Sequence, residues 1–361
     1  MIAERELWNH FLTSQPGGHL LQSYQWGELI EHRGGRIYRL GALEDGHLVG
    51  AMMLSVAPVP LPAPLQGHGI SWLYCPRGPL VAGPHAPALA ALLEQAHALA
   101  RKERVVVLRL EPNLTEDDPQ RDDWLAAYHA LGFRTSPIAI HGRRSWVLDL
   151  RPDLGTLFTN FRKAWRQDIH IAERRGVVVR EAENTADFDA YYQLLQRTSE
   201  RAGFFIHNKK HHQEMLHLFS QTGDAVLYLA ELEGKPIAAK MLIRFGSWCF
   251  DMFGATADND RSLPKTHLLQ FRCLQWAKEQ GCLSFDFRTI PEVLKPGEEM
   301  WGVYQFKKGF GGFSRLHLPT QDYVYHPLIY TLWRGSAQIR RHLRRVKRKM
   351  SLLKRSFVGR T

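Results

Sequence analysis

The chain has 361 residues, of which 44% are hydrophobic and 23% are charged, as in ordinary folded proteins and unlike disordered or collagen-like ones. A chain of this length is long enough to form two domains. The four cysteines show no C-x-x-C spacing, so they predict neither a redox motif nor a metal site. The formal net charge of +11 lies entirely in residues 331–361, which hold eleven Lys or Arg and no Asp or Glu.

The N-terminal residues 1–6 are charged and lead into no apolar stretch typical of a secretory signal. No run of residues approaches the roughly 18 apolar positions that a membrane-spanning helix needs. We therefore expect a cytoplasmic protein, which the basic C-terminal segment could also bring to the inner face of the membrane.

Two similar segments lie about 190 residues apart, at residues 40–54 and 229–243. Each has an apolar run, an acidic turn centred on glycine and a second apolar run, which predicts a β-hairpin. In the first copy a predicted helix over 86–103 leads into a strand over 105–112, and in the second a helix over 266–280 leads into a strand over 283–287. This order is that of the central part of the GNAT acyltransferase fold, and it occurs twice.

Residues 161–177, between the two copies, predict a basic amphipathic helix that ends at a glycine. Such a helix is usually a solvated surface element, and we do not infer nucleic-acid binding from it alone.

Four stretches form an ordered set: residues 21–28 (LQSYQWGE), 74–80 (YCPRGPL), 161–177 and 301–312 (WGVYQFKKGFGG). This set resembles the opening Q-S-x-x-W element, the Y-x-P-R-G-P-L strand, the central helix and the closing G-x-x-x-F-K-x-x-F-G-G motif of the FemABX family of tRNA-dependent aminoacyltransferases. The order of the elements is the family's order.

The resemblance implies an α/β fold with two tandem GNAT-like acyltransferase domains, each with a mixed β-sheet. We expect domain 1 to span residues 1–145 and to be completed by about 314–330, and domain 2 to span 146–313. A basic amphipathic C-terminal helix is expected over 331–361. Residues 185–245 leave no room for the long helical arm of FemA-like members, so the chain looks like the shorter FemX-like type.

The implied reaction moves Gly, Ala or Ser from an aminoacyl-tRNA to the side-chain amine of the third residue of a peptidoglycan stem peptide, forming the interpeptide bridge. The acceptor would be lipid II or UDP-MurNAc-pentapeptide. No cofactor is implied. The amino acid transferred, the carrier of the acceptor, the choice between a lysine and an ornithine acceptor and the oligomeric state stay open.

Attack on the ester carbonyl places negative charge on its oxygen, and one well-placed donor at such an oxygen is worth about 3 kcal/mol. The resemblance assigns this role to Lys307, with Phe306 packed beside it; Lys308 would point elsewhere if the stretch is extended. Glu111, which precedes Pro112, stands at the family's acidic position. We expect Glu111 to bind substrate first and to act as a base second, because the terminal ribose hydroxyl of the tRNA is an alternative proton relay.

The diphosphate of the precursor calls for Arg or Lys ligands. Arg201 resembles the family's phosphate-binding arginine, although it also fits a plain arginine at a helix end. The family's second ligand, a lysine four residues after the opening Trp26, is replaced by Ile30, so Arg33 or Arg36 would have to substitute. The expected substrate-binding residues are Arg201, Trp26, Arg33, Arg36, Arg77 and Phe253.

Phe253 stands where members of the family often have a tyrosine, and Arg77 could serve only to hold its own loop. His207, His211 and His212 lie among lysines without an accompanying carboxylate or cysteine, which predicts a solvated polar turn and no metal site.

In the C-terminal segment, apolar residues from Ile339 to Leu353 recur at spacings of three and four and form one stripe on a basic helix. The counter-charge could be tRNA phosphate or an anionic membrane, and both stay open. The residues expected at this contact are Arg340, Arg341, Arg344, Arg345, Lys347 and Arg348.

Two other functions compete with this interpretation. An acyl-CoA-dependent N-acyltransferase on the same fold would need a glycine-rich pyrophosphate loop, and neither residues 80–90 nor 255–263 contain one. A non-catalytic RNA- or membrane-binding protein would have no need of the closing motif, which is intact over residues 306–312.

Overall fold

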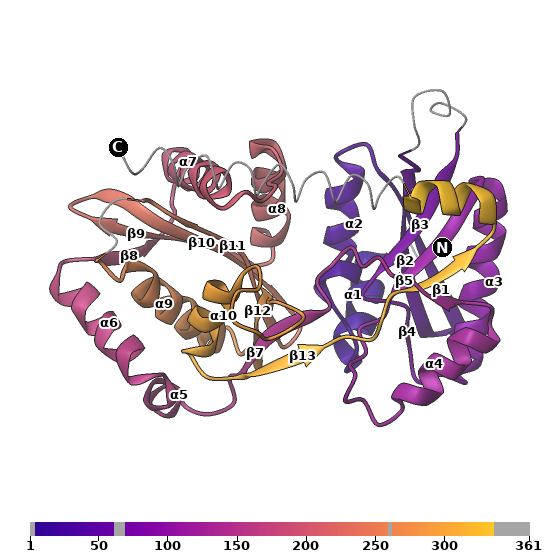
Figure 1. Ribbon diagram of the computed structural model, residues 1–361, viewed down its shortest axis with the longest axis horizontal. Helices are drawn as coiled ribbons and strands as arrows, with labels where there is room; N and C mark the ends of the chain where they lie inside the picture. The colour runs from indigo at the N-terminus through magenta and orange to yellow at the C-terminus, as the bar shows by residue number, and fades with distance from the viewer. Residues whose placement is uncertain (1–3, 61–68, 259–261, 336–361) are drawn as a thin grey trace.

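The computed structural model describes residues 4–60, 69–258 and 262–335. They form two α/β units that lie side by side (Figure 1). Each unit is built on a seven-stranded mixed sheet.

The first sheet has the strand order β1-β2-β3-β5-β14-β6, with β4 paired to β2. The strands are β1 (Arg36–Glu44), β2 (His47–Pro58), β3 (Ser71–Pro76), β4 (Leu80–Val81), β5 (Val105–Glu111), β6 (Arg134–Thr135) and β14 (Gln321–Val324). The predicted hairpin is confirmed: β1 and β2 pair antiparallel and turn at Asp45 and Gly46, whose φ angles of 49° and 80° suit a tight hairpin turn.

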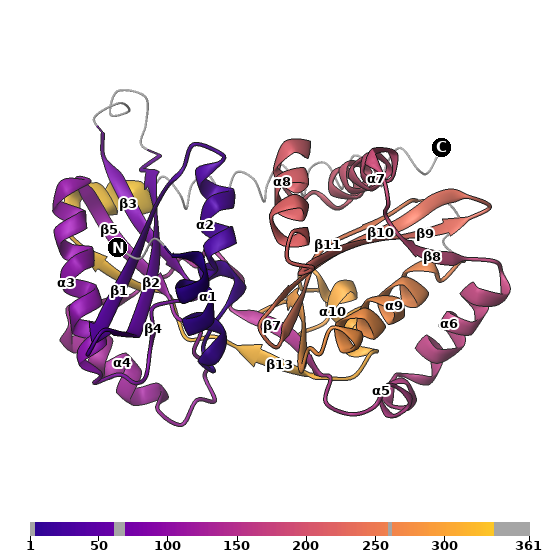
Figure 2. The same ribbon diagram turned by 180° about the vertical axis from the view of Figure 1, so that it is seen from behind.

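Alternate residues of β2 face opposite sides of this sheet, as expected for a strand. Met52 and Leu54 pack with helix α3, whereas Ala51 and Met53 belong to the apolar cluster that includes α1. Figure 2 shows α1 and α2 on the side of the sheet that faces the second unit. The helices of the first unit are α1 (Arg5–Ser14), the 3-10 turn η1 (Leu20–Gln22), α2 (Tyr24–Glu31), α3 (Pro87–Lys102) and α4 (Arg121–Ala130).

The second sheet has the strand order β13-β7-β12-β11-β10-β9-β8. The strands are β7 (Arg144–Asp149), β8 (Val178–Glu181), β9 (Ala225–Leu232), β10 (Lys235–Phe245), β11 (Trp248–Thr256), β12 (Ser284–Thr289) and β13 (Phe313–Leu316). The second predicted hairpin is also confirmed, because β9 and β10 pair antiparallel and turn at Glu233 and Gly234, with φ angles of 52° and 71°.

Helices α7 (Thr185–Ala202) and α8 (Lys209–Ser220) cover one face of the second sheet (Figure 1). The opposite face carries α5 (Leu154–Asn160), α6 (Lys163–Arg174), α9 (Lys265–Glu279) and α10 (Trp301–Lys308). Apart from the short strand β4, which lies between β3 and α3, the succession β1-β2-β3-α3-β5 is repeated as β9-β10-β11-α9-β12. In both copies the third strand pairs parallel with the last.

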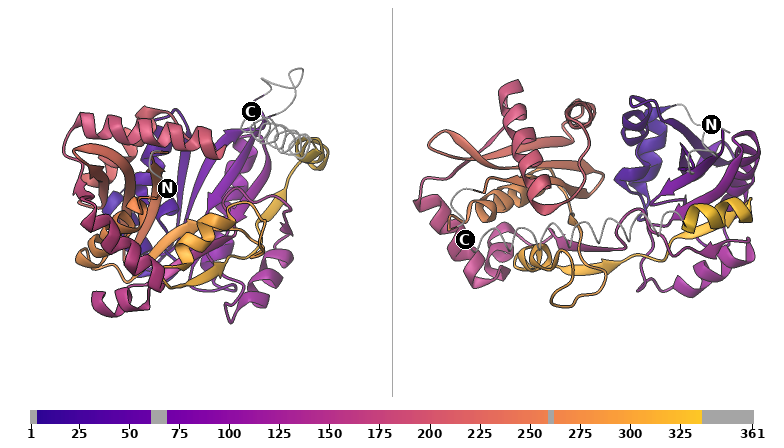
Figure 3. Two further views of the ribbon diagram at one scale, coloured as in Figure 1. Left: turned by 60° about the vertical axis from the view of Figure 1, so that its left-hand side comes forward. Right: turned by 45° about the horizontal axis from the view of Figure 1, so that its top comes forward.

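The chain crosses between the units twice, from β6 to β7 and from β13 to β14. Strand β7 follows β6 in sequence but joins the second sheet beside β12, and β13 then pairs with β7. The chain finally returns to the first sheet, where β14 lies between β5 and β6, followed by the helical residues 327–335 (Figure 3).

Two features hold the units together. The returning strand is tied by Asp322, which forms two hydrogen bonds of 2.7 Å with Arg109 of β5, and both side chains are fully buried. One apolar cluster also spans the two units, joining Trp8 and Leu12 of α1 to Tyr191 of α7 and Phe219 of α8. No helix in residues 4–60, 69–258 and 262–335 is long and apolar enough to cross a membrane.

Candidate active site

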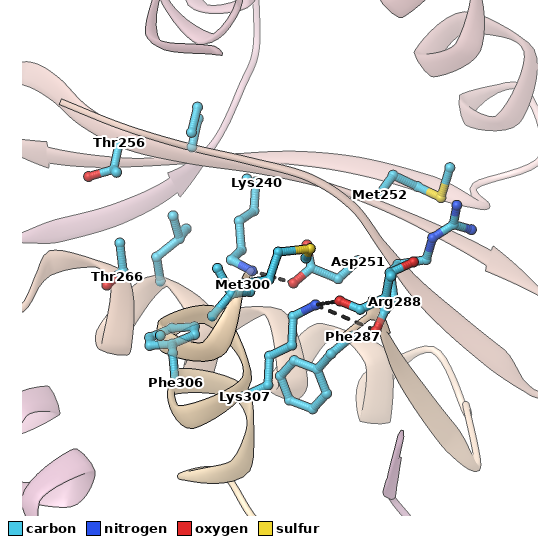
Figure 4. Close-up of a pocket in the computed structure, with 17 residues that line it drawn as sticks. Lys240, Asp251, Met252, Thr256, Thr266, Phe287, Arg288, Met300, Phe306 and Lys307 are labelled. Atoms are coloured by element: carbon cyan, nitrogen blue, oxygen red, sulfur yellow. Dashed lines mark hydrogen bonds and ion pairs between the residues drawn. The ribbon is translucent and has the colours of Figure 1, made fainter. Parts of the chain in front are cut away.

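A cavity opens in the second unit where two parallel strands separate. The pairing of β11 with β12 extends only from Trp248 to Phe250 on one strand and from Ser284 to Asp286 on the other. Beyond these positions the strands line a cavity of about 490 Å³, which α9 and α10 close from the other side (Figure 4). In the first unit the equivalent pairing of β3 with β5 continues as far as Pro76 and Glu111. The two copies therefore differ at the position of this cavity.

Lys307 projects from α10 into the cavity and is only 9% exposed (Figure 4). Its Nζ donates a hydrogen bond to the backbone carbonyl of Thr289 at 2.8 Å and lies 3.5 Å from that of Arg288. Burial lowers the pKa of Lys307 to about 8, although the carboxylate of Asp251 acts in the opposite direction. The ammonium is thus charged at neutral pH and has hydrogen-bond acceptors that a substrate oxygen can replace.

An ion pair that sequence analysis missed forms another wall. Lys240 of β10 and Asp251 of β11 contact each other through Nζ and Oδ2, and each residue is 8% exposed. Lys240, Arg288 and Lys307 are cations and Asp251 is the carboxylate among the charged side chains that line the cavity, so the lining carries net positive charge. The sequence does contain a signal for this pair, because Lys240 and Asp251 are single charges within apolar runs. Such charges are seldom buried unless they are paired.

Phe306 forms part of the cavity lining beside Lys307. Its ring centroid lies 5.2 Å from those of His267 and Phe310. Its backbone carbonyl accepts a hydrogen bond of 2.9 Å from Nε1 of Trp165, a residue of α6. The position of the Phe306–Lys307 pair is therefore set by α6 as well as by α10.

Lys308 was expected to point away from Lys307 if this stretch is extended; the stretch is not extended, since Trp301–Lys308 is the helix α10. Its two buried residues, Tyr304 and Lys307, lie one turn apart on the same face. Successive residues of a helix are about 100° apart around its axis. Lys308 consequently leaves the cavity, and its Nζ lies 5.7 Å from the centre of the Tyr304 ring.

Glu111 lies at the end of β5 in the first unit and is 4% exposed. Its carboxylate accepts hydrogen bonds of 2.5 Å from the Tyr74 hydroxyl and the backbone N–H of Ile140, and it also contacts His141 Nδ1 at 3.1 Å. Burial acts to raise the pKa of Glu111, but the bonds from His141, Tyr74 and Ile140 outweigh it and hold the pKa at about 2. This geometry makes Glu111 an anchor for the segment that precedes β7, and its predicted roles as substrate ligand and base stay predictions.

Arg77 lies directly after β3 and is 8% exposed. Its Nη2 donates a hydrogen bond of 3.0 Å to the backbone carbonyl of Gly142. Arg77 and Glu111 therefore hold neighbouring points of one segment, residues 138–142, at the edge of the first unit.

The other expected substrate-binding residues do not lie together in the structure. Arg201 donates to the carbonyl of Thr256, a cavity residue, at 3.2 Å. Phe253 packs on His212 with ring centroids 4.4 Å apart, and Trp26 packs against the apolar cluster shared by the two units. Arg33 is exposed and follows the end of α2. Arg36, the first residue of the outer strand β1, forms an ion pair of 2.5 Å with Glu103.

The prediction of a solvated histidine turn is wrong for two of its three residues. His211 and His212 lie in the first turn of α8, 4% and 0% exposed, because that turn packs against α7. The Tyr191 hydroxyl lies 3.0 Å from His212 Nδ1. Burial lowers the pKa of His211 to about 3 and that of His212 to about 4, so both rings are neutral at neutral pH.

No group of three or more metal-ligating side chains occurs in the part of the chain that the structure describes. The predicted contacts of the basic C-terminal segment, Arg340, Arg341, Arg344, Arg345, Lys347 and Arg348, lie outside the described residues.

Comparison with known proteins gives matches along almost the whole chain. The model of the FemAB family matches residues 3–236 and 233–335. A lipid II:glycine glycyltransferase of Staphylococcus saprophyticus is 24% identical over 391 residues, covering 89% of this chain and 92% of that protein. The protein of the same description from Staphylococcus aureus strain MRSA252 is 23% identical over 415 residues, covering 94% and 96%.

Among solved structures, a crystal structure of FemX aligns with a TM-score of 0.82 at 20% identity, covering 92% of this chain and 98% of that one. A tandem GNAT protein from the clavulanic acid biosynthesis pathway aligns with a TM-score of 0.51 at 15% identity, covering 82% and 93%. These alignments confirm the expected fold of two tandem GNAT-like units.

Proposed function

Because the chain belongs to the FemAB family, we propose that it is an aminoacyltransferase that moves an amino acid from aminoacyl-tRNA to a peptidoglycan precursor. The proposed acceptor is the side-chain amine of the third residue of the stem peptide, and the amino acid is Gly, Ala or Ser. The names of the relatives favour lipid II as the carrier and glycine as the amino acid. A lipid-linked acceptor would bring the protein to the inner face of the membrane.

The observation that carries this proposal is a buried cation that lines an open, mostly apolar cavity. Lys307 offers N–H groups that are bonded only to backbone carbonyls, in a cavity whose size suits the end of a substrate rather than a whole macromolecule. Positive charge that is fixed in a site of low polarity stabilises a developing oxyanion strongly, because little reorganisation is needed during the reaction.

The proposed chemistry is a single acyl transfer. The neutral acceptor amine attacks the carbonyl carbon of the aminoacyl ester, forming a C–N bond and placing negative charge on the carbonyl oxygen, which Lys307 stabilises. The intermediate then collapses, the C–O bond to the tRNA ribose breaks, and the proton lost by the amine passes to the departing hydroxyl. Phe306, beside Lys307, helps to exclude water that would hydrolyse the ester.

The proposal predicts the effect of replacing Lys307. In single-turnover transfer from charged tRNA to lipid II, Lys307→Ala should lower the rate by about 100-fold or more, the usual effect of losing one oxyanion donor. Lys307→Arg, which keeps the charge, should recover part of the rate. Equal rates for the wild type and Lys307→Ala, with both proteins folded, would remove Lys307 from the mechanism.

A further inference from the structure

Two arginines from different units lie near one segment at the junction between the units. Arg77 bonds the carbonyl of Gly142, and a Cβ atom at Gly142 would lie 2.2 Å from Thr289. Thr289 is the residue after Arg288. Arg77 follows β3 in the first unit, and Arg288 belongs to β12 in the second. Both have positive φ angles, 51° and 67°, which are uncommon for residues other than glycine. A backbone held in this region is strained, and such strain concentrates at functional positions.

Neither guanidinium forms an ion pair within the described residues. The hydrogen bond from Arg77 goes to a neutral carbonyl, that of Gly142. The three nearby carboxylates are engaged elsewhere: Asp286 accepts from the backbone N–H of Arg288 at 2.6 Å, Asp251 pairs with Lys240, and Glu111 holds Tyr74 and Ile140. Buried charge without a partner is costly, and here two such charges of the same sign occur together.

Three histidines also surround the two arginines. Burial, followed by the charges of Arg77 and Arg288, lowers the pKa of His19. Burial and the same arginines also act to lower the pKa of His141, and burial and Arg77 that of His317, so all three rings are neutral at neutral pH. The junction thus presents two cations and three neutral hydrogen-bonding rings, beside carboxylates that already accept hydrogen bonds from other groups.

Arg288 also connects this junction to the transfer site. Its backbone carbonyl lies 3.5 Å from Lys307 Nζ, and the residue is part of the cavity lining. Figure 4 shows its guanidinium on the side of the cavity away from Phe306 and Thr256. A group bound there would lie next to the reacting centre.

We propose that Arg288 and Arg77 bind an oxyanion of the acceptor, a carboxylate or a phosphate, at the junction of the two units. This inference rests on the proposed function, because it assigns part of the acceptor's binding site. Arg36, which was expected to bind the acceptor, is already paired with Glu103. Arg288 and Arg77 would provide positive charge for the acceptor in its place. Guanidinium groups suit both anions, since they donate two parallel hydrogen bonds to carboxylate or phosphate.

The test uses Arg288→Asn, because asparagine tolerates a positive φ and removes the charge. With UDP-MurNAc-pentapeptide as the probe, KM for the acceptor should rise about 10- to 100-fold, the effect of losing a hydrogen bond to a charged group. The KM for aminoacyl-tRNA should not change. Arg288→Lys should restore part of the affinity, which a purely structural role of Arg288 would not produce.

Arg104→Asn is the matched control, because Arg104 also has a positive φ, of 50°, but is exposed and remote from the cavity lining. The free pentapeptide, which lacks the diphosphate, separates the two sources: a higher KM with it as well assigns a peptide carboxylate, and an effect only on the nucleotide-linked acceptor assigns a phosphate. A wild-type KM for both acceptors in folded Arg288→Asn would overturn the inference. Failure of the wild type to transfer at all would instead overturn the proposed function.

Discussion

Lys307 is a cation whose burial disfavours its charged form. Lys307 lies in a motif that is visible in the sequence, but its partners were not predictable in the same way. Lys240, Asp251 and Arg288 come from three strands and belong to no local motif, and only the fold brings them to one cavity. The role expected for Glu111 also depended on facts that a sequence does not contain, namely that Tyr74 and Ile140 already occupy its carboxylate.

The pKa of Lys307 leads to a prediction at this scale. Burial lowers that pKa to about 8, so the ammonium loses its proton as the pH rises through this value. The rate that depends on the cation should therefore fall above about pH 8. Arginine at position 307 would stay charged throughout, because its pKa exceeds about 12.

The measurement is the ratio of kcat/KM for aminoacyl-tRNA between the wild type and Lys307→Arg from pH 6.5 to 9.5. Ionisation of the acceptor amine affects both proteins equally and cancels in the ratio, and ester hydrolysis without enzyme is subtracted at each pH. The ratio should decrease above about pH 8. A ratio that stays constant over this range would show that the charge of Lys307 does not limit the reaction.

Helix α10 places Lys307 and Phe306, and α6 fixes the position of α10. The contact depends on Gly309: a Cβ atom there would lie 2.2 Å from Nε1 of Trp165, the group that bonds the Phe306 carbonyl. Both hairpins and the helices α3 and α9 were predictable, because turn residues and apolar spacing are local signals. The helical conformation of α10 was not predictable in this way, because the closing motif in residues 301–312 is matched by residue type alone.

Gly309→Ala should force Trp165 away from Phe306 and displace the pair at the cavity. We expect kcat to fall about 10-fold or more, because small displacements of reacting groups are costly. Overpacking should also destabilise the protein by about 1–3 kcal/mol. Gly83→Ala is the control, since a Cβ atom there meets no other atom within 4 Å. Wild-type kcat in Gly309→Ala would mean that α6 has no part in placing the site.

At the scale of the whole molecule, two copies of one fold differ in how far their parallel strands pair. In the second unit β11 and β12 separate and form the cavity, whereas in the first unit β3 and β5 stay paired as far as Glu111. The repeat itself was visible in the sequence. The two crossings, from β6 to β7 and from β13 to β14, were not visible in the pattern of residues, because they depend on contacts such as that between Arg109 and Asp322, 213 positions apart.

The central claim is that the whole protein uses aminoacyl-tRNA as its donor and a peptidoglycan precursor as its acceptor. Its most direct test is transfer of radiolabelled Gly, Ala and Ser from charged tRNA to purified lipid II and to UDP-MurNAc-pentapeptide, with acyl-CoA donors in parallel. We predict label in at least one of these acceptors from charged tRNA and none from acyl-CoA. Transfer from an acyl-CoA, with no transfer from charged tRNA to either acceptor, would contradict this account and identify a different N-acyltransferase.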